Sequence, residues 1–282
     1  MTTGIRFDAS APYEVEESDV VYARPDGMEL LARVYRPKGT PAASLIGLVD
    51  VHGGAWNRGD RTVGVHHGRG LAAAGMVVAS LDFRQGPDHR HPAAVADVAA
   101  GVRWMRANAA RLGVDPTRLG LVGQSSGGQL ALFVALQPST ADDSVAFVLV
   151  QYPVADPLAR YRYVLSREHE PRESAFDAGR LIASHRAFFA DEAAMAEASA
   201  TRIVSTGAAR TLPPVWLAQP EVDDNVPAEI TEAFVSAYGK AGGRIERVFF
   251  PGARHGFMQQ AGPDTDKAIA SMREFVGREI AR

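Results

Sequence analysis

The 282-residue chain contains no cysteine, which excludes disulfide bonds, thiol catalysis and a cysteine-based metal site. It also lacks any segment that approaches the roughly 20 consecutive apolar residues of a membrane-spanning helix. Residues 1–19 are polar and acidic, without the apolar core of a signal peptide. Together these absences favour a soluble, cytoplasmic protein without membrane insertion.

An excess of charge is missing as well. The formal net charge is −3 at pH 7, which argues against a surface that binds nucleic acid or another polyanion. The sequence contains no glycine-rich phosphate loop, internal repeat or low-complexity tract. The pairs His66-His67 and His89-Arg90-His91 have no third ligand at metal spacing, so we expect surface or loop residues there and neither a metal nor a cofactor.

The sequence does contain apolar strands that alternate with helical stretches from residue 45 onward. This alternation is typical of a mostly parallel sheet covered by helices on both faces. A hairpin turn at Pro25-Asp26-Gly27 joins two earlier strands. We expect one α/β domain over residues 1–282, with helices that include 93–108 and 228–241. Its eight strands are predicted at residues 20–23, 30–35, 45–51, 76–81, 119–122, 145–151, 215–218 and 244–250.

Residues 156–211 break the alternation, because they are rich in charge and carry a helical stripe around Leu181. We expect a helical insertion that forms a cap or lid over the pocket; the alternative is an ordinary connecting helix packed on the sheet. Phe188 and Phe189 are candidates to line that pocket, together with Trp56 from another loop. A solvated face, rather than an acid-binding site, is expected for the arginines at positions 160, 162, 167 and 172.

The most informative motif is Gly123-Gln124-Ser125-Ser126-Gly127, which lies between an apolar strand and a run of helix formers. A strand, a tight turn and a helix around Gly-x-Ser-x-Gly are the context of a nucleophile elbow. The glycines let the backbone turn sharply, so that the Ser125 hydroxyl projects from the corner. Because a glycine-rich turn alone gives the same pattern, the interpretation depends on partners elsewhere in the chain.

A serine nucleophile needs a histidine base, which a carboxylate orients. In this type of fold the order along the chain is serine, acid, histidine. His255 follows a strand and has glycines on both sides, and we expect it to be the base. Asp223 and Asp224 follow the strand at 215–218, with Glu221 as a weaker candidate. We favour Asp223 as the acid; the structural alternative is that Asp224 or Asn225 caps the following helix.

A second glycine-containing loop, His52-Gly53-Gly54-Ala55, follows the strand at 45–51. The N–H groups of Gly53, Gly54 or Ala55, with that of Ser126, are candidates to hold the negative charge of a tetrahedral intermediate. His52 is expected to order the loop through backbone hydrogen bonds. Because the carboxyl ends of parallel strands meet at one edge of the sheet, we expect these loops to converge there.

Taken in order, these motifs resemble the α/β-hydrolase superfamily, and in particular the carboxylesterases and lipases similar to hormone-sensitive lipase. The resemblance covers residue 19 to the C-terminus, with a weaker stretch in the region of the expected insertion. Ala55 replaces the last glycine of the common His-Gly-Gly-Gly motif, a variant that resembles feruloyl-esterase-like and kynurenine-formamidase-like bacterial relatives. The resemblance rests on HGGAW (52–56), DFR (82–84), PAAVAD (92–97), GQSSGG (123–128), Asp223 with Val226-Pro227, and HGF (255–257).

The motifs and the resemblance together predict a serine carboxylesterase that hydrolyses small carboxylic esters through an acyl-enzyme. The resemblance alone implies short acyl chains and small or aromatic alcohols. The alternative is an amidase of the arylformamidase type, motivated by Trp56, and a non-catalytic small-molecule binder is a further one. The sheet edge at 244–250 and the last helix are candidate surfaces for a homodimer, which the pattern does not decide.

Overall fold

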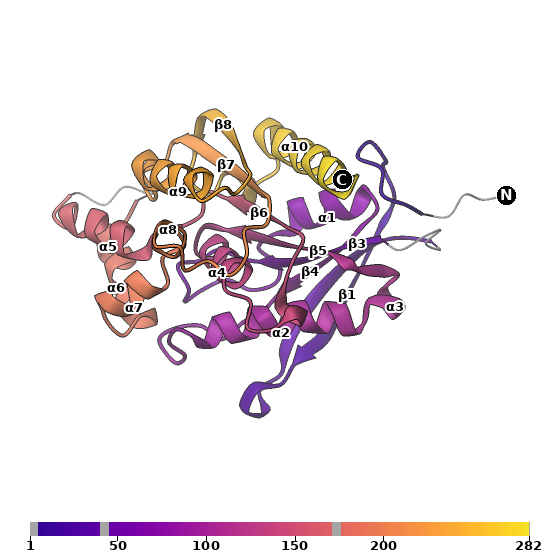
Figure 1. Ribbon diagram of the computed structural model, residues 1–282, viewed down its shortest axis with the longest axis horizontal. Helices are drawn as coiled ribbons and strands as arrows, with labels where there is room; N and C mark the ends of the chain where they lie inside the picture. Colours follow the sequence, from indigo (N-terminus) through magenta and orange to yellow (C-terminus); the bar gives the residue numbers. More distant parts are fainter. Residues whose placement is uncertain (1–4, 40–44, 171–175, 282) are drawn as a thin grey trace.

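The computed structural model describes residues 5–39, 45–170 and 176–281, which are built around one eight-stranded sheet (Figure 1). The strands lie in the order β1-β2-β4-β3-β5-β6-β7-β8. Their bounds are β1 Val15–Ala23, β2 Leu30–Pro37, β3 Leu45–Val51, β4 Met76–Leu81, β5 Val114–Gln124, β6 Phe147–Gln151, β7 Val215–Val222 and β8 Ile245–Arg254. The predicted fold class is confirmed, and several strands are longer than the apolar runs that indicated them.

The sheet is antiparallel only where β1, β2 and β4 pair, and parallel from β4 to β8. The turn Pro25–Gly27 joins β1 to β2, with Asp26 in the left-handed region at φ 51°. From β3 the chain goes first to β4 on one side and later to β5 on the other. Loops that leave neighbouring strands at such a reversal diverge, which opens a crevice for a ligand.

Helices cover both faces of the sheet (Figure 1). The helices α1 (Val65–Ala73) and α10 (Pro263–Ile280) pack on one face, and α2 (Ala93–Ala107), α4 (Ser125–Leu136) and α9 (Ala228–Lys240) pack on the other, with the short α3 (Ala109–Leu112) following α2. Side chains of β3 alternate between the two cores: Leu48 belongs to the first, and Val49 and Val51 to the second. This period of two is why a parallel strand, covered on both faces, is apolar throughout.

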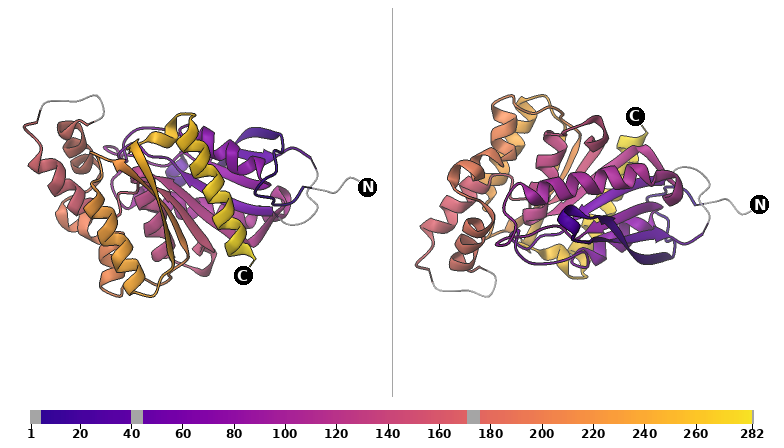
Figure 2. Two further views of the ribbon diagram at one scale, coloured as in Figure 1. Left: turned by 90° about the horizontal axis from the view of Figure 1, so that it is seen from above. Right: turned by 90° about the horizontal axis from the view of Figure 1, so that it is seen from below.

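The chain between β6 and β7 is helical and gathers at the end of the molecule opposite the N-terminus (Figure 2). Within the described residues it contains α5 (Pro157–Ser166), α6 (Ala178–Phe188), α7 (Glu192–Glu197) and α8 (Ala200–Ser205). Each of these helices begins at a side-chain cap that accepts a backbone N–H: Asp156, Asp177, Asp191 and Ser199. Arg172 lies outside the described residues.

No helix in the described parts of the chain combines the length and the apolar character needed to cross a membrane.

Candidate active site

Ser125 lies at the sharp turn between β5 and α4, with a backbone φ of 51°. A non-glycine residue in this region is strained, and such strain is typical of functional turns. The turn is possible because Gly127 has no side chain: a Cβ there would lie 2.1 Å from the carbonyl oxygen of Val51 and 2.3 Å from that of His52. Glycine therefore lets the first turn of α4 lie directly against the end of β3.

His255 connects Ser125 to Asp223 through two hydrogen bonds. Its Nε2 lies 2.8 Å from the Ser125 Oγ, and its Nδ1 lies 2.9 Å from the Asp223 Oδ2. Because an ionised carboxylate only accepts, Nδ1–H donates to Asp223, and Nε2 is left free to accept the serine proton. Sheet register explains the meeting: Val222 of β7 pairs with Arg254 of β8, so the next residue of each strand is adjacent.

The other carboxylates of the acid loop are engaged elsewhere. Glu221 accepts from the backbone N–H of Gly252 at 2.7 Å, and an Asp224 oxygen lies 3.5 Å from Arg254. No side chain caps α9, so neither Asp224 nor Asn225 takes the capping role that was the alternative. The second oxygen of Asp223 accepts from two backbone N–H groups of its own loop, at 2.9 and 2.8 Å. These bonds fix the carboxylate that orients His255.

Two further histidines near the site are buried and neutral. His52 donates from Nδ1 to the carbonyl oxygen of Gly53 at 2.6 Å and stacks on Phe83, so it orders the loop after β3. Burial lowers the pKa of His52. In α6, His185 donates to the carbonyl oxygen of Leu181 at 2.8 Å, and burial lowers its pKa to about 3.

The loop after β3 lies beside the nucleophile because Val51 pairs with Gly123 in the sheet, two residues before Gly53 and Ser125 respectively. A Cβ on Gly53 would lie 3.3 Å from that of Ser125. The backbone then runs through three positive φ values, 124° at Gly54, 53° at Ala55 and 64° at Trp56. Such a turn directs backbone N–H groups toward the loop's concave side, where they can serve as anion donors.

Ser126 has two separate roles, one for its backbone N–H and one for its side-chain hydroxyl. It is the second residue of α4, where a backbone N–H has no acceptor within its own helix. Its hydroxyl is buried and accepts from the N–H of Trp56 at 3.3 Å. The side chain thus ties the loop after β3 to the elbow, while the backbone N–H is left as a donor beside Ser125.

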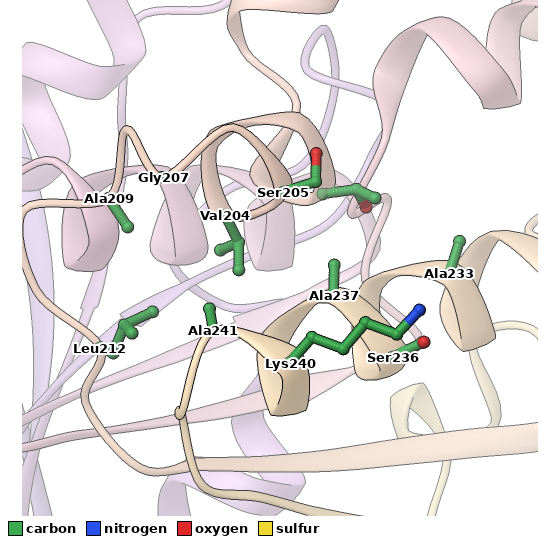
Figure 3. A pocket seen from close by; sticks show the side chains of 11 residues that line it. Val204, Ser205, Gly207, Ala209, Leu212, Ala233, Ser236, Ala237, Lys240 and Ala241 are labelled. Atoms are coloured by element: carbon green, nitrogen blue, oxygen red, sulfur yellow. The ribbon is translucent and has the colours of Figure 1, made fainter.

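Ser125 and His255 line a cavity of about 390 Å³, together with Gly53, Gly54 and Ala55. A larger cavity of about 630 Å³ lies between α8 and α9, and Figure 3 shows it lined by small or apolar side chains and Lys240. None of the candidate catalytic residues lines that larger cavity. We therefore place the site at the smaller one, where nucleophile and base are together.

The prediction that Trp56, Phe188 and Phe189 line the pocket is wrong. All three are completely buried in the core, where the Trp56 and Phe188 rings stack at 5.5 Å. The indole N–H of Trp56 donates to the side chain of Gln129 on α4 at 2.9 Å. Trp56 therefore connects α6 to α4, and it is not among the residues that line the cavity.

The expectation of a solvated arginine face is wrong for Arg160. Its side chain is buried, lines the cavity and binds Asn225 in the acid loop, whereas Arg162 is exposed and pairs with Glu192. Sequence reasoning also missed Arg58, Arg180, Asn225 and Gln259 as lining residues. A signal for Arg160 was present, since the buried face of α5 is Pro157, Arg160, Tyr161 and Val164, at helical spacing.

A buried polar network extends from the residue before Ser125. Gln124 donates to Nδ1 of His67 at 3.3 Å, and Nε2 of His67 donates to Asp50 at 2.9 Å. The Tyr152 hydroxyl donates to Gln124 at 3.1 Å, and its ring lies 4.8 Å from that of His255. The prediction of a surface or loop position is therefore wrong for His67. In the described residues, no group of three or more His, Cys, Asp or Glu side chains is placed to hold a metal ion.

A sequence model of the alpha/beta hydrolase fold matches residues 48–259, a range that includes Ser125, Asp223 and His255. The chain belongs to the α/β-hydrolase fold family. It is similar to carboxylesterase NlhH of Mycobacterium tuberculosis, with 36% identity over 143 residues that cover 49% of this chain and 43% of NlhH. Esterase LipC of the same organism is 29% identical over 261 residues, which cover 88% of this chain and 62% of LipC. The chain thus spans less than two thirds of the length of either relative.

This α/β hydrolase is also similar to solved esterase structures. A thermophilic esterase from the Planctomycetes species Thermogutta terrifontis, with propionate bound, has 28% identity and a TM-score of 0.72 over 95% of this chain and 94% of that one. The form of that esterase phosphonylated by sarin has 27% identity and a TM-score of 0.74 over 92% of this chain and 94% of that one. A bacterial heroin esterase shares the fold, with a TM-score of 0.77 at 23% identity over 97% and 86% of the two chains.

Proposed function

We propose that this α/β hydrolase is a serine carboxylesterase that hydrolyses small carboxylic esters. The observation that carries the proposal is the hydrogen-bonded triad Ser125–His255–Asp223 at the wall of a cavity. His255 lies 2.8 Å from the Ser125 Oγ and 2.9 Å from the Asp223 Oδ2. The similarity to a carboxylesterase and to several esterases supports it.

In the proposed mechanism, the Ser125 hydroxyl attacks the ester carbonyl carbon while His255 Nε2 takes its proton. Asp223 holds the tautomer of His255 and stabilises the imidazolium that forms. His255 then gives the proton to the leaving alcohol, which leaves an acyl group on Ser125. Water attacks this acyl-enzyme with the same base, and the carboxylic acid departs.

The negative charge on the tetrahedral intermediate is held by backbone N–H groups. The donors are those of Gly53, Gly54 or Ala55 on one loop and of Ser126 at the start of α4. The N–H of Trp56 is not available, because it donates to the Ser126 hydroxyl. A single such donor typically contributes a factor of about 10²–10³ to the rate.

A short acyl chain fits the small size of the cavity, about 390 Å³. The esterase from Thermogutta terrifontis has been solved with propionate and with butyrate bound, which agrees with this size. The helices α5 and α6 contribute Arg160, Arg180 and Leu181 to the cavity wall, and we propose that residues 156–211 act as its cap. A cytoplasmic location, a homodimer and the lack of a cofactor stay predictions.

The arylformamidase interpretation stays the alternative: Trp56 lies in the loop after β3, although its ring is buried and does not line the cavity. The binder interpretation predicts no turnover at all, so one experiment separates it from an esterase.

Hydrolysis of p-nitrophenyl esters from acetate to laurate tests the proposal with the wild type and the Ser125→Ala variant. We expect turnover with a preference for acetate or butyrate, and a fall in kcat of about 10⁵-fold or more in the variant. Ser205→Ala, which removes a hydroxyl at the larger cavity, is the matched control and keeps wild-type kcat. Turnover that persists in Ser125→Ala contradicts the assignment of the nucleophile.

A further inference from the structure

Three guanidinium groups line the cavity that holds Ser125, and they lie at different depths. Arg160 of α5 is buried, Arg180 of α6 is half-buried, and Arg58, in the loop after β3, is exposed. They come from segments far apart in the sequence, so no local charge run indicated them. No aspartate or glutamate among the described residues lines this cavity.

The three arginines differ from those elsewhere that pair directly with carboxylates, as Arg61 does with Asp82 at 2.9 Å and Arg84 with Asp97 at 2.9 Å. They also differ from Arg273, which lacks an ion pair among the described residues but donates to backbone carbonyl oxygens away from this cavity. In the described parts of the chain, no carboxylate lies within ion-pair distance of Arg58, Arg160 or Arg180. The cavity therefore concentrates positive charge beside the nucleophile, although the chain as a whole is slightly acidic.

Arg160 is the deepest of the three, and part of its hydrogen-bonding capacity is unused. Its Nε donates to the carbonyl oxygen of Asn225 at 3.2 Å, and Nη2 donates to the side-chain oxygen of the same residue. Its Nη1 is buried and has no partner within the described residues. A buried charged donor without an acceptor is costly, and an acceptor entering from the cavity would remove that cost.

The charges also act on one another. The pKa of Arg160 is lowered to about 9, mainly by burial; the charge of Asp223 opposes this effect, and the charge of Arg180 adds to it. Burial lowers the pKa of Arg180 too, and the neighbouring charge of Arg58 adds to this while Asp177 opposes it. An anion between these groups would relieve both desolvation and mutual repulsion.

We propose that the substrate is an ester that carries a carboxylate, which Arg160 and Arg180 bind while Ser125 attacks the ester carbonyl. This inference rests on the proposed esterase function and names its substrate class. Arg58 at the rim of the cavity attracts the anion, and the deeper guanidinium groups fix its position. The reaction itself is unchanged: the acyl C–O bond breaks, and water supplies a hydroxyl to the acyl group and a proton to the alcohol.

The carboxylate can belong to the acyl part, as in a half-ester of a short dicarboxylic acid, or to the alcohol part, as in an acylated hydroxy acid. Both present the same group to the arginines. Two pairs of nearly isosteric esters separate them: monoethyl glutarate against ethyl 5-methylhexanoate, and acetoxyacetate against isobutyl acetate. In each pair the members differ mainly in the carboxylate.

The measured quantity is the ratio of kcat/KM for the charged ester to that for its neutral partner, followed by acid release in a pH-stat. A charge-assisted hydrogen bond at a partly buried site corresponds to a preference of roughly 10- to 100-fold. We expect such a preference in at least one pair with the wild type. In Arg180→Gln the ratio falls by about tenfold, mainly through KM, and Arg180→Lys restores part of it.

Arg162→Gln is the control for Arg180→Gln, because Arg162 also lies on a helix between β6 and β7 but is exposed, pairs with Glu192 and does not line the cavity. It keeps the wild-type ratio. A purely structural role for the pocket arginines predicts that Arg180→Gln lowers turnover of charged and neutral esters alike. That result, or a wild type that prefers the neutral ester in both pairs, overturns the inference.

Binding to the Ser125→Ala variant tests the inference apart from turnover. Calorimetric titration with monoethyl glutarate and acetoxyacetate is expected to show binding of at least one of them, and binding weakens about tenfold when Arg180→Gln is added. This result supports the anion site even if the wild type hydrolyses none of the esters, an outcome that counts against the esterase proposal alone. If neither charged ester binds, the anion site is overturned.

Discussion

The two sides of the cavity are built in different ways. On one side, Ser125, Asp223 and His255 lie on loops at strand ends, where sheet register, hydrogen bonds and left-handed backbone fix their positions. On the other side, Arg160 and Arg180 lie on helices of the segment between β6 and β7. Their place at the cavity depends on which helix face is buried, not on a turn that only certain residues allow.

This difference explains which substitutions affect chemistry and which affect stability. On the strand-end side, strained backbone and close contacts between backbone segments leave little freedom at each position. A substitution of a single glycine or polar side chain there is therefore expected to have a large effect. The helical side packs through an aromatic cluster that includes Trp56, His185 and Phe188, so its residues act mainly through burial. Three predictions sharpen the comparison.

The largest effect is expected on the strand-end side, in Asp223→Asn. An amide cannot hold the required tautomer of His255, so kcat on p-nitrophenyl acetate falls by about 10⁴-fold while the fold is kept. The matched control is Asp224→Asn, because that carboxylate is partly exposed and its 3.5 Å contact with Arg254 contributes little. It stays within about fivefold of the wild type. A loss of less than tenfold in Asp223→Asn contradicts the assigned acid.

A smaller effect, on stability, is expected for Gly127→Ala. The added Cβ would meet the carbonyl oxygens of Val51 and His52 at 2.1 and 2.3 Å, and backbone atoms cannot yield as a flexible side chain does. Urea unfolding is expected to show a loss of about 3 kcal/mol in the free energy of unfolding.

The control is Gly239→Ala in α9, where nothing lies within 4 Å of the added Cβ. There the free energy of unfolding rises by about 0.5–1 kcal/mol, because alanine favours the helix. Equal effects at positions 127 and 239 would mean that the contact between α4 and β3 is not tight.

The smallest effect, over the tested range from pH 7 to 5, is a pH dependence of stability on the helical side. Burial lowers the pKa of His185 to about 3, so the folded protein keeps it neutral. The unfolded chain takes up a proton below about pH 6.5, which means that the unfolded state binds more protons there. The free energy of unfolding therefore falls by about 1.4 kcal/mol per pH unit as the pH falls from about 6.5 toward 3.

Burial also lowers the pKa of His91, to about 4, and adds a slope of the same sign. The test therefore compares the slopes of wild type and His185→Leu in urea unfolding between pH 7 and 5. We expect the free energy of unfolding of the variant to change less steeply with pH, by about 1.4 kcal/mol per pH unit, which corresponds to the uptake of one proton. An unchanged slope contradicts the burial of a neutral histidine at this position.

Much of the fold followed from local pattern. Residues 45–51 and 76–81 are apolar throughout because both faces of a parallel strand are covered, and the predicted bounds of these two strands agree with the structure. The early part of β5 was not predicted, because Asp115-Pro116-Thr117 reads as a turn although β5 runs from Val114. The start of β5 is set by its pairing with β3, where Val114 pairs with Leu45, and a local sequence pattern carries no information about such pairing.

For the site, the sequence singled out the residues whose chemistry and backbone requirements are local: a serine between glycines, an acid after a strand, and a histidine between glycines. The structure brings these together, and it brings Arg160 there too, although the sequence suggested a solvated face. Trp56 shows the opposite error, because its motif position pointed to the pocket while its packing against Phe188 removed it.

The sequence by itself therefore determined the strand–helix alternation and the chemical groups that the turns present, because strand burial and sharp turns restrict residue type position by position. Only the tertiary structure decided which charged side chains reach the cavity and which are solvated. Arg160 and Arg162 are two positions apart on one helix, and packing alone turned one toward Asn225 and left the other in water.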